Sequence, residues 1–186
     1  PHVGDRYFSL GRRLISQGQI APGLDALARA RQAAPQQDVY YLISSDLLAS
    51  LAAGMGDPQQ QAQMFDRARA LGAQAVSLKP GQPYTIANLA HIELRQAEAT
   101  TNPQLRAAAI QRGLDLHEKM ASVLTFDPAI YDDWGYLYTL KRDYPRALEK
   151  YQAALKLERD RAQTLLLMGH AQREAGDLEG ALQTYN

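Results

Sequence analysis

Residues that commonly bind metals or catalyse reactions are few in this sequence, and their spacing does not suit either task. The sequence contains no cysteine. Its four histidines form no H-E-x-x-H pair or other spaced ligand set; they are His2, His91, His117 and His170. Without cysteine, a zinc site would need histidine and carboxylate ligands at a regular spacing, and none is present. We therefore predict no metal centre and no cofactor.

Nucleophiles and paired acids are equally poorly placed for catalysis. Ser44 and Ser45 lack the surrounding G-x-S-x-G motif of a nucleophile elbow, so we expect them to be small packing residues. Adjacent residues on a helix point about 100° apart, so Asp132 and Asp133 cannot flank one bond as acid and base. We interpret both aspartates as helix-start acids favoured by the helix dipole. The sequence thus predicts no catalytic residues and no enzyme.

Charge and hydropathy exclude further classes of protein. The 186 residues include 20 basic and 20 acidic side chains, and this zero net charge argues against a nucleic-acid-binding surface. No apolar stretch approaches the roughly 20 residues that a membrane-spanning helix needs, so we expect no membrane contact by this sequence itself. The sequence is compatible with two compartments, the cytoplasm and the extracytoplasmic face of a bacterial membrane, because both tolerate a cysteine-free chain.

A repeat with a 34-residue period organises the sequence. Alanine and leucine are abundant and the β-branched residues are scarce, which favours helices over strands. Small and bulky residues recur at matching places, namely Trp134-Gly135, Ala147 and Tyr151, then Met168-Gly169, Ala181 and Tyr185, with Leu10-Gly11 and Gly23 near the N-terminus. This pattern resembles the tetratricopeptide repeat (TPR), a helix–turn–helix unit of about 34 residues. The resemblance implies close helix crossings at the glycines and a protein-binding role.

We predict an all-α fold, a right-handed α-solenoid of antiparallel helix pairs forming one domain over residues 1–186. Its units cover about 4–37, 38–82, 83–127, 128–161 and 162–186, the last being truncated. The second and third units are each eleven residues longer, close to three helical turns, so we expect extended helices there. The expected helices are Tyr40–Ala53, Pro58–Leu78, Tyr84–Ala99 and Pro103–Phe126. Asp57-Pro58 and Asn102-Pro103 would start the second helix of each long unit.

The candidate binding site is a groove lined by the first helix of each pair, the helix that usually faces the concave side of a solenoid. Placing the repeat frame on the sequence gives eight residues, called here the predicted groove residues: Phe8, Arg12, Asp46, His91, Arg95, Tyr136, His170 and Glu174. TPR proteins that bind chaperones use lysine and asparagine at such places to hold a C-terminal carboxylate. Here Phe8, Leu42 and Ala87 replace the lysines, and Arg12 and Asp46 replace the asparagines. This specific activity is therefore not expected. A groove that is merely solvated remains the alternative.

Three segments resemble a narrower group, the soluble TPR region of bacterial O-antigen ligase or polymerase-like membrane proteins: QDVYYLISSDLL, LKPGQPYTIANLAHIELRQAE and LTFDPAIYDDWGYLYTLKRDYPRALEKY. Two functions follow: a non-catalytic scaffold that binds a peptide or partner domain, or an extracytoplasmic accessory domain of such a membrane enzyme. The chain begins with proline and ends within a helical pattern, so we expect a piece of a longer protein, which on the narrower resemblance is membrane-anchored. Leu178, Leu182 and Tyr185 would then be exposed and promote self-association.

Overall fold

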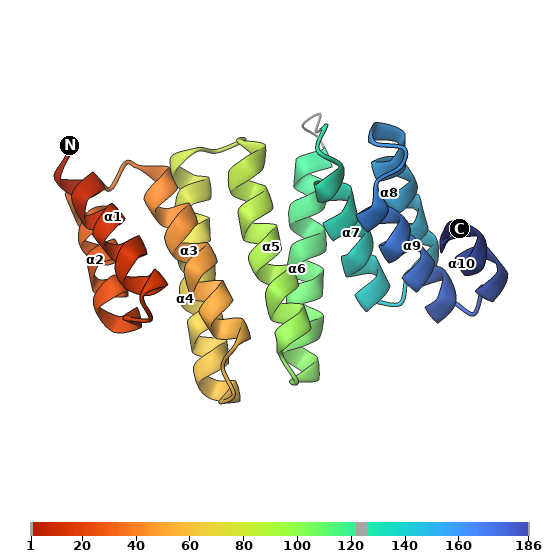
Figure 1. Ribbon diagram of the computed structural model, residues 1–186, viewed down its shortest axis with the longest axis horizontal. Helices are drawn as coiled ribbons and strands as arrows, with labels where there is room; N and C mark the ends of the chain where they lie inside the picture. The colour runs from red at the N-terminus through yellow and green to blue at the C-terminus, as the bar shows by residue number, and fades with distance from the viewer. Residues whose placement is uncertain (1, 122–125, 186) are drawn as a thin grey trace. The chain divides into compact units, whose positions relative to one another are not determined.

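The structure is a computed structural model that describes residues 2–121 and 126–185. These residues form ten helices and no strand, which confirms the predicted all-α class. In chain order the helices are α1 (Val3–Ser16), α2 (Ile20–Ala33), α3 (Asp38–Ala53), α4 (Pro58–Leu78), α5 (Pro83–Ala99), α6 (Pro103–Ala121), α7 (Pro128–Leu140), α8 (Tyr144–Leu157), α9 (Ala162–Glu174) and α10 (Leu178–Tyr185) (Figure 1).

The helices fall into two compact units, the first reaching Ile92 and the second beginning at Glu93. In the first unit α1 packs against α2 and α3 against α4, as antiparallel pairs, and α2 also contacts α3 (Figure 1). In the second unit α7 pairs with α8 and α9 with α10, while α6 contacts α7 and α8 contacts α9. No helix in the described part of the chain is long and apolar enough to span a bilayer.

Aspartate or asparagine before proline starts the helices as the sequence predicts. The Asp57 carboxylate accepts a hydrogen bond from the Gln60 backbone N–H at 2.8 Å, and Pro58 occupies the first turn of α4. Asn102 caps α6 in the same way, and Asp127 caps α7 through the Ala129 N–H at 2.9 Å. These side chains satisfy backbone donors that the first helical turn leaves without a partner.

The longer middle helices are also confirmed, and in the α3–α4 pair most of the additional residues lie in α4. Helix α4 has 21 residues against 14 in α2, whereas α3 has 16 against 14 in α1. Helix α6 extends over 19 residues to Ala121. Its predicted end at Phe126 lies across residues 122–125, which are outside the described residues, and Phe126 itself is not helical.

Small residues let paired helices approach closely, as the repeat pattern predicts. A Cβ atom added to Gly135 of α7 would lie 2.6 Å from Cε1 of Tyr151 on α8. Gly169 faces the ring of Tyr185 in the same way, and a Cβ at Gly11 would lie 2.8 Å from Cγ of Leu27. Real Cβ contacts are essentially never this short, so a side chain at any of these glycines would require its neighbour to shift. The neighbours of Gly11 and Gly135, Leu27 and Tyr151, are fully buried and have little room to do so.

The turns within three helix pairs use one backbone conformation. Gly18 and Gly176 have φ angles of 78° and 87°, in the left-handed region that glycine adopts without steric cost. Arg142 stands at the corresponding place between α7 and α8 and has a φ angle of 64°. An arginine in this conformation carries backbone strain that the two glycines avoid.

Candidate functional site

The predicted groove residues all lie on the first helices of pairs or on α5. Phe8 and Arg12 lie on α1, Asp46 on α3 and His91 on α5, all in the first unit. Arg95 lies on α5, Tyr136 on α7, and His170 and Glu174 on α9, all in the second unit. The two groups are therefore described separately.

In the first unit, Phe8 is part of an aromatic cluster that joins α1 to α3. Its ring stacks on Tyr40 with centroids 4.8 Å apart, and the Arg12 guanidinium lies over the Phe8 ring at 5.9 Å. The Tyr40 hydroxyl donates to the Asp5 carboxylate at 2.5 Å, and this hydrogen bond, together with burial, raises the pKa of Tyr40 to about 12. Phe8 thus contributes to packing, while Arg12 presents an exposed charge.

Asp46 and His91 are half-buried, and each already has a polar or electrostatic partner within the protein. Between their helices, Ser45 Oγ of α3 lies 2.9 Å from Asn88 Oδ1 of α5. Ser45 is fully buried, in agreement with its predicted packing role. This part of the predicted groove consists of side chains that are held in place by internal contacts.

In the second unit, four helices bring a polar cluster together around Tyr136. Burial is the largest cause that raises the pKa of Tyr136, followed by the charge of Glu98 and a hydrogen bond to it. Glu174 raises this pKa as well, and Arg106 acts in the opposite direction. The residues come from α5, α6, α7 and α9, so successive first helices do place side chains within electrostatic reach of one another. We call Glu98, Arg106, Tyr136 and Glu174 the Tyr136 cluster.

Glu98 and Arg106 were not identified from the sequence. Glu98 lies three residues after Arg95 on α5, and residues at this spacing share one face of a helix. The spacing of Glu98 from Arg95 could therefore have identified Glu98 as a groove residue. Arg106 is on the second helix of its pair, and no repeat rule placed it near the groove.

A pocket adjoins the Tyr136 cluster and shares Arg106 with it. The pocket has a volume of about 410 Å³ and lies between α6 and the end of α7. Apolar side chains, Ile110 and Leu140 among them, form part of its lining, and Arg106 and Lys141 supply positive charge. The Lys141 ammonium donates to Gln111 Oε1 at 3.1 Å. An apolar lining with a few fixed polar groups is the usual composition of a ligand pocket.

His170 lies on α9, is exposed, and contacts two other side chains. Its Nδ1 is 3.1 Å from Nη2 of Arg173, and its ring meets the Tyr185 ring edge-on at 6.4 Å.

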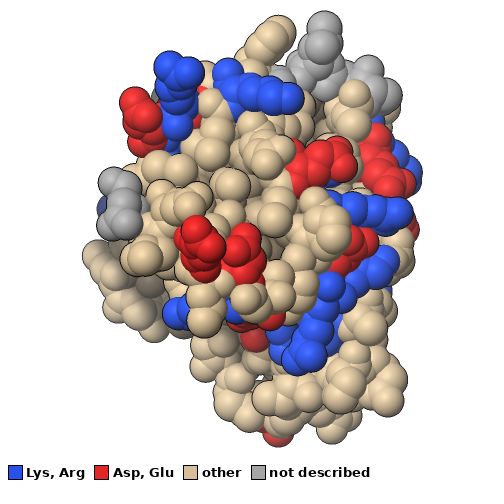
Figure 2. All heavy atoms as spheres, turned by 90° about the vertical axis from the view of Figure 1, so that its right-hand side faces the viewer, with Lys and Arg blue, Asp and Glu red and all other residues tan. Residues whose placement is uncertain are grey.

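The face drawn in Figure 2 carries acidic and basic side chains interspersed among uncharged residues, instead of separated by sign. A partner that contacts this face would meet charges of both signs.

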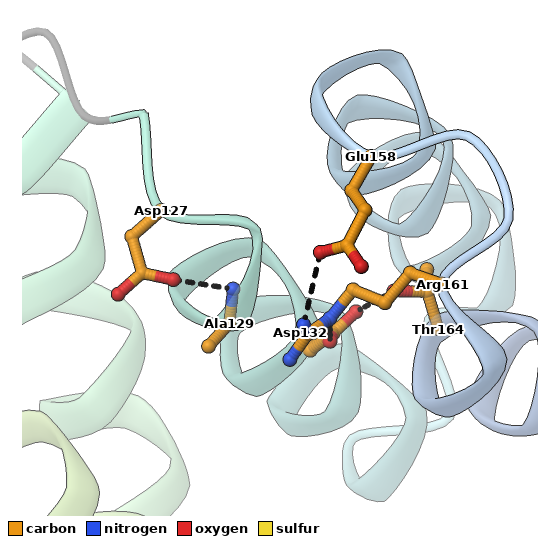
Figure 3. A network of polar contacts seen from close by, with 6 residues as sticks. All are labelled: Asp127, Ala129, Asp132, Glu158, Arg161 and Thr164. Carbon is orange, nitrogen blue, oxygen red and sulfur yellow. Dashed lines mark hydrogen bonds and ion pairs between the residues drawn. The ribbon is translucent and has the colours of Figure 1, made fainter.

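Asp132 has a different role from the one its position predicted. It lies beyond the first turn of α7, and its side chain is only 5% exposed. Its carboxylate accepts from Arg161 Nε at 2.9 Å and from Thr164 Oγ1 at 2.7 Å, while Arg161 also contacts Glu158 at 3.2 Å (Figure 3). The interpretation of Asp132 as a helix-start acid was therefore wrong, because this residue joins α7 to α9 and the turn before it.

This network engages both oxygens of the Asp132 carboxylate with internal donors, so the group is not presented to a substrate. No three His, Cys, Asp or Glu side chains within residues 2–121 and 126–185 are grouped as metal ligands.

Antiparallel helix pairs with glycine at their crossings and left-handed residues in their turns define a helical-repeat fold of the TPR type. No protein-family model and no curated protein sequence matches the chain. Solved structures of TPR proteins are similar to it in fold. MamA (residues 41 to the end) from Desulfovibrio magneticus RS-1 has a TM-score of 0.74 and 14% identity, over 98% of this chain and 90% of that one.

Two further structures show the same fold. TTC0263, a thermophilic TPR protein in Thermus thermophilus, has a TM-score of 0.68 and 17% identity, over 98% of this chain and 88% of that one. PilW, a type IV pilus biogenesis factor, has a TM-score of 0.70 and 13% identity, over 100% of this chain and 77% of that one. At these identities the likeness extends to the fold alone.

Proposed function

We propose that the chain is a non-catalytic scaffold that binds a peptide or a partner domain at the Tyr136 cluster and the pocket beside it. One observation carries the proposal: side chains from four helices converge on a half-buried tyrosine next to a pocket with an apolar lining and two cations. Tyrosine and arginine dominate binding energy at protein interfaces when they are partly desolvated.

The residues that line the pocket determine which kind of peptide would fit it. Ile110 and Leu140 would contact an apolar side chain, and Arg106 and Lys141 would attract a neighbouring carboxylate. Glu98 and Glu174 offer acceptors for donors on the same peptide. We therefore expect a peptide in which an apolar residue stands beside an acidic one. A solved TPR protein of similar fold, YrrB, with a TM-score of 0.57 and 16% identity, has been described as having an unusual peptide-binding site, which supports this class of ligand.

A peptide array probed with the 186-residue chain, followed by titration of the best peptide, tests the proposal. Tyr136→Ala should weaken binding about 30-fold, the effect of removing an interface residue worth about 2 kcal/mol. Arg106→Gln should weaken the binding of acidic peptides, and Arg159→Gln, an exposed arginine outside the pocket, is the matched control. Equal effects of the two arginine variants would contradict the assignment.

The predicted groove gives a second test. If binding survives the joint replacement of Arg12, His91, Arg95 and Tyr136, the ligand binds elsewhere on the molecule. Conversely, hydrolysis of simple esters or glycosides that one substitution abolishes would refute the non-catalytic part of the proposal.

A narrower version of this proposal is that the scaffold is an extracytoplasmic accessory domain of a membrane-embedded O-antigen or glycan ligase or polymerase. Its support is the resemblance of the three segments given above. The version requires transmembrane helices elsewhere in the same polypeptide, so a full gene product without them would refute it and leave the peptide-binding proposal intact.

A further inference from the structure

A second pocket, in the first unit, has a different chemistry from the Tyr136 cluster. It has a volume of about 400 Å³ and lies among α2, α3 and α4. Arg31 from α2 and Arg67 from α4 both line it, together with Ser44 from α3. None of the predicted groove residues belongs to it.

Arg31 is fixed in place at this pocket. Its Nη1 donates to Oγ of Ser44 at 2.6 Å, and the Ser44 hydroxyl in turn donates to the Tyr40 carbonyl at 2.6 Å. Ser44 is only 1% exposed, so a buried hydroxyl group orients the guanidinium. A guanidinium has five N–H donors, and this contact uses one of them.

The two arginines lie within electrostatic reach of each other and lack an acidic partner. Burial is the largest cause that lowers the pKa of the half-buried Arg31 guanidinium. Tyr41 acts in the opposite direction, and the charge of Arg67 is a smaller cause that lowers this pKa. In the described chain, 2–121 and 126–185, no carboxylate lies within ion-pair distance of Arg31 or Arg67.

An acidic residue does line the pocket, but its charge is already offset. The Asp25 carboxylate pairs with Arg29 at 2.9 Å on the same helix. Arg31 and Arg67, which have no ion-pair partner of their own among the described residues, repel each other, and a single dianion between them would remove this repulsion. Bidentate contacts from arginine are well suited to phosphate oxygens.

The remainder of the lining is apolar and would contact the group that carries the anion. Ala21, Leu24 and Ala28 of α2 and Leu48 of α3 supply this surface. A volume of about 400 Å³ is within the range of small-ligand pockets. The ligand that fits is therefore a dianion attached to an apolar stem, not a fully hydrated free ion.

We propose that the pocket formed by Arg31, Ser44 and Arg67 binds a phosphate monoester dianion carried on an apolar stem. Such a group could come from a small phosphorylated molecule or from a phosphorylated side chain of a polypeptide. Both sources present the same phosphate oxygens to the two guanidinium groups. The apolar lining of the pocket then favours the source whose stem makes the better contact with it.

Titration of the 186-residue chain with phenyl phosphate, followed by NMR or calorimetry, tests this. We expect binding in the millimolar range or tighter, stronger than that of inorganic phosphate, which has no stem. Removing one charge-assisted contact should weaken binding about tenfold, so Arg67→Gln is expected to have this effect and Arg67→Glu a larger one. Arg67 is exposed, so neither change should impair folding.

A matched control separates a site from general attraction to positive charge. The double variant Arg31→Gln/Arg67→Gln should abolish binding, whereas Arg6→Gln/Arg13→Gln, which removes the same charge from exposed positions on α1, should leave it unchanged. Thermal unfolding of each variant checks that the fold is retained. Equal losses in both double variants, or no binding of phenyl phosphate by the unmodified chain, would overturn the proposal.

Two peptide arms identify the source. A phosphoserine peptide with flanking apolar residues and its unphosphorylated form are titrated against the same variants. Tighter binding of the phosphopeptide than of phenyl phosphate, lost in Arg67→Glu, supports the pocket and assigns it to a polypeptide. Binding of phenyl phosphate alone supports the pocket and assigns it to a small molecule. The Tyr136→Ala variant should leave all of these affinities unchanged, which separates this proposal from the peptide-binding one.

Discussion

Replacing Thr164 by valine should destabilise the second unit through one hydrogen bond to a buried charge. The Thr164 hydroxyl is fully buried and donates to Asp132 at 2.7 Å. Valine keeps the shape but removes the donor, and a hydrogen bond to a charged group contributes about 1.5–3 kcal/mol. We expect a loss of about 2 kcal/mol in the free energy of unfolding, measured by urea denaturation followed by circular dichroism. At a typical slope of about 2 kcal/mol/M, the unfolding midpoint falls by about 1 M.

Two companion variants make the reasoning specific. Thr184 donates to the neutral Oε1 of Gln172, also at 2.7 Å, so Thr184→Val should cost only about 1 kcal/mol. Glu158 contacts Arg161 at 3.2 Å but is 55% exposed, and Glu158→Gln should cost about 0.5 kcal/mol or less. If Glu158→Gln proved as damaging as Thr164→Val, burial would not be what gives the network its strength.

A double-mutant cycle isolates the contact itself. Asp132→Asn removes the charge and keeps the shape, so Thr164→Val should cost less in that background than in the unmodified chain. We expect a coupling energy of about 1 kcal/mol between the two changes, as is typical of residues in one hydrogen-bonded network. Strictly additive losses would refute the view that the hydroxyl acts through the carboxylate.

Four further predictions concern other sites. Gly135→Ala should lower unfolding free energy by about 1–3 kcal/mol, because its Cβ would lie 2.6 Å from Tyr151, and calorimetry would reveal this overpacking. Arg142→Gly should raise thermal stability by about 1 kcal/mol by relieving the strain at a φ angle of 64°. Burial lowers the pKa of His117, so the folded state resists protonation and stability falls as the pH drops below about 6.5; His117→Gln should lose less stability between about pH 7.5 and pH 5. Leu182 is 63% exposed, so the chain should self-associate at high concentration, and Leu182→Glu should keep it monomeric in sedimentation experiments.

Local signals predicted the helices well because each acts over a few residues. Asp57 before Pro58 marks the start of α4, and the predicted span Pro58–Leu78 matches the observed helix at both ends. Gly135 and Gly169 likewise indicated close helix crossings, because glycine destabilises a helix and is seldom placed inside one for another reason. Repetition reinforced these signals by giving each position a counterpart in another unit.

Contacts between distant residues could not be predicted in the same way. Asp132 and Arg161 are 29 positions apart, and their ion pair depends on how α7 is rotated about its axis and on where the turn before α9 lies. The Tyr136 cluster and the Arg31–Arg67 pair could not be predicted for the same reason, because each brings together residues from different helix pairs. A repeat frame places helices in order, but it does not specify the side chains that fill the space between them.

The glycine crossings limit which helices can be exchanged between the units. Gly11 is covered by Leu27, whereas Gly135 and Gly169 are each covered by a tyrosine ring. If α8 or α10 replaced α2 as the partner of α1, its tyrosine would lie against Gly11, where the space is filled by a leucine in this structure. Recombination of this sequence, by evolution or by design, should succeed when a whole hairpin moves as one module and fail when its two helices are separated.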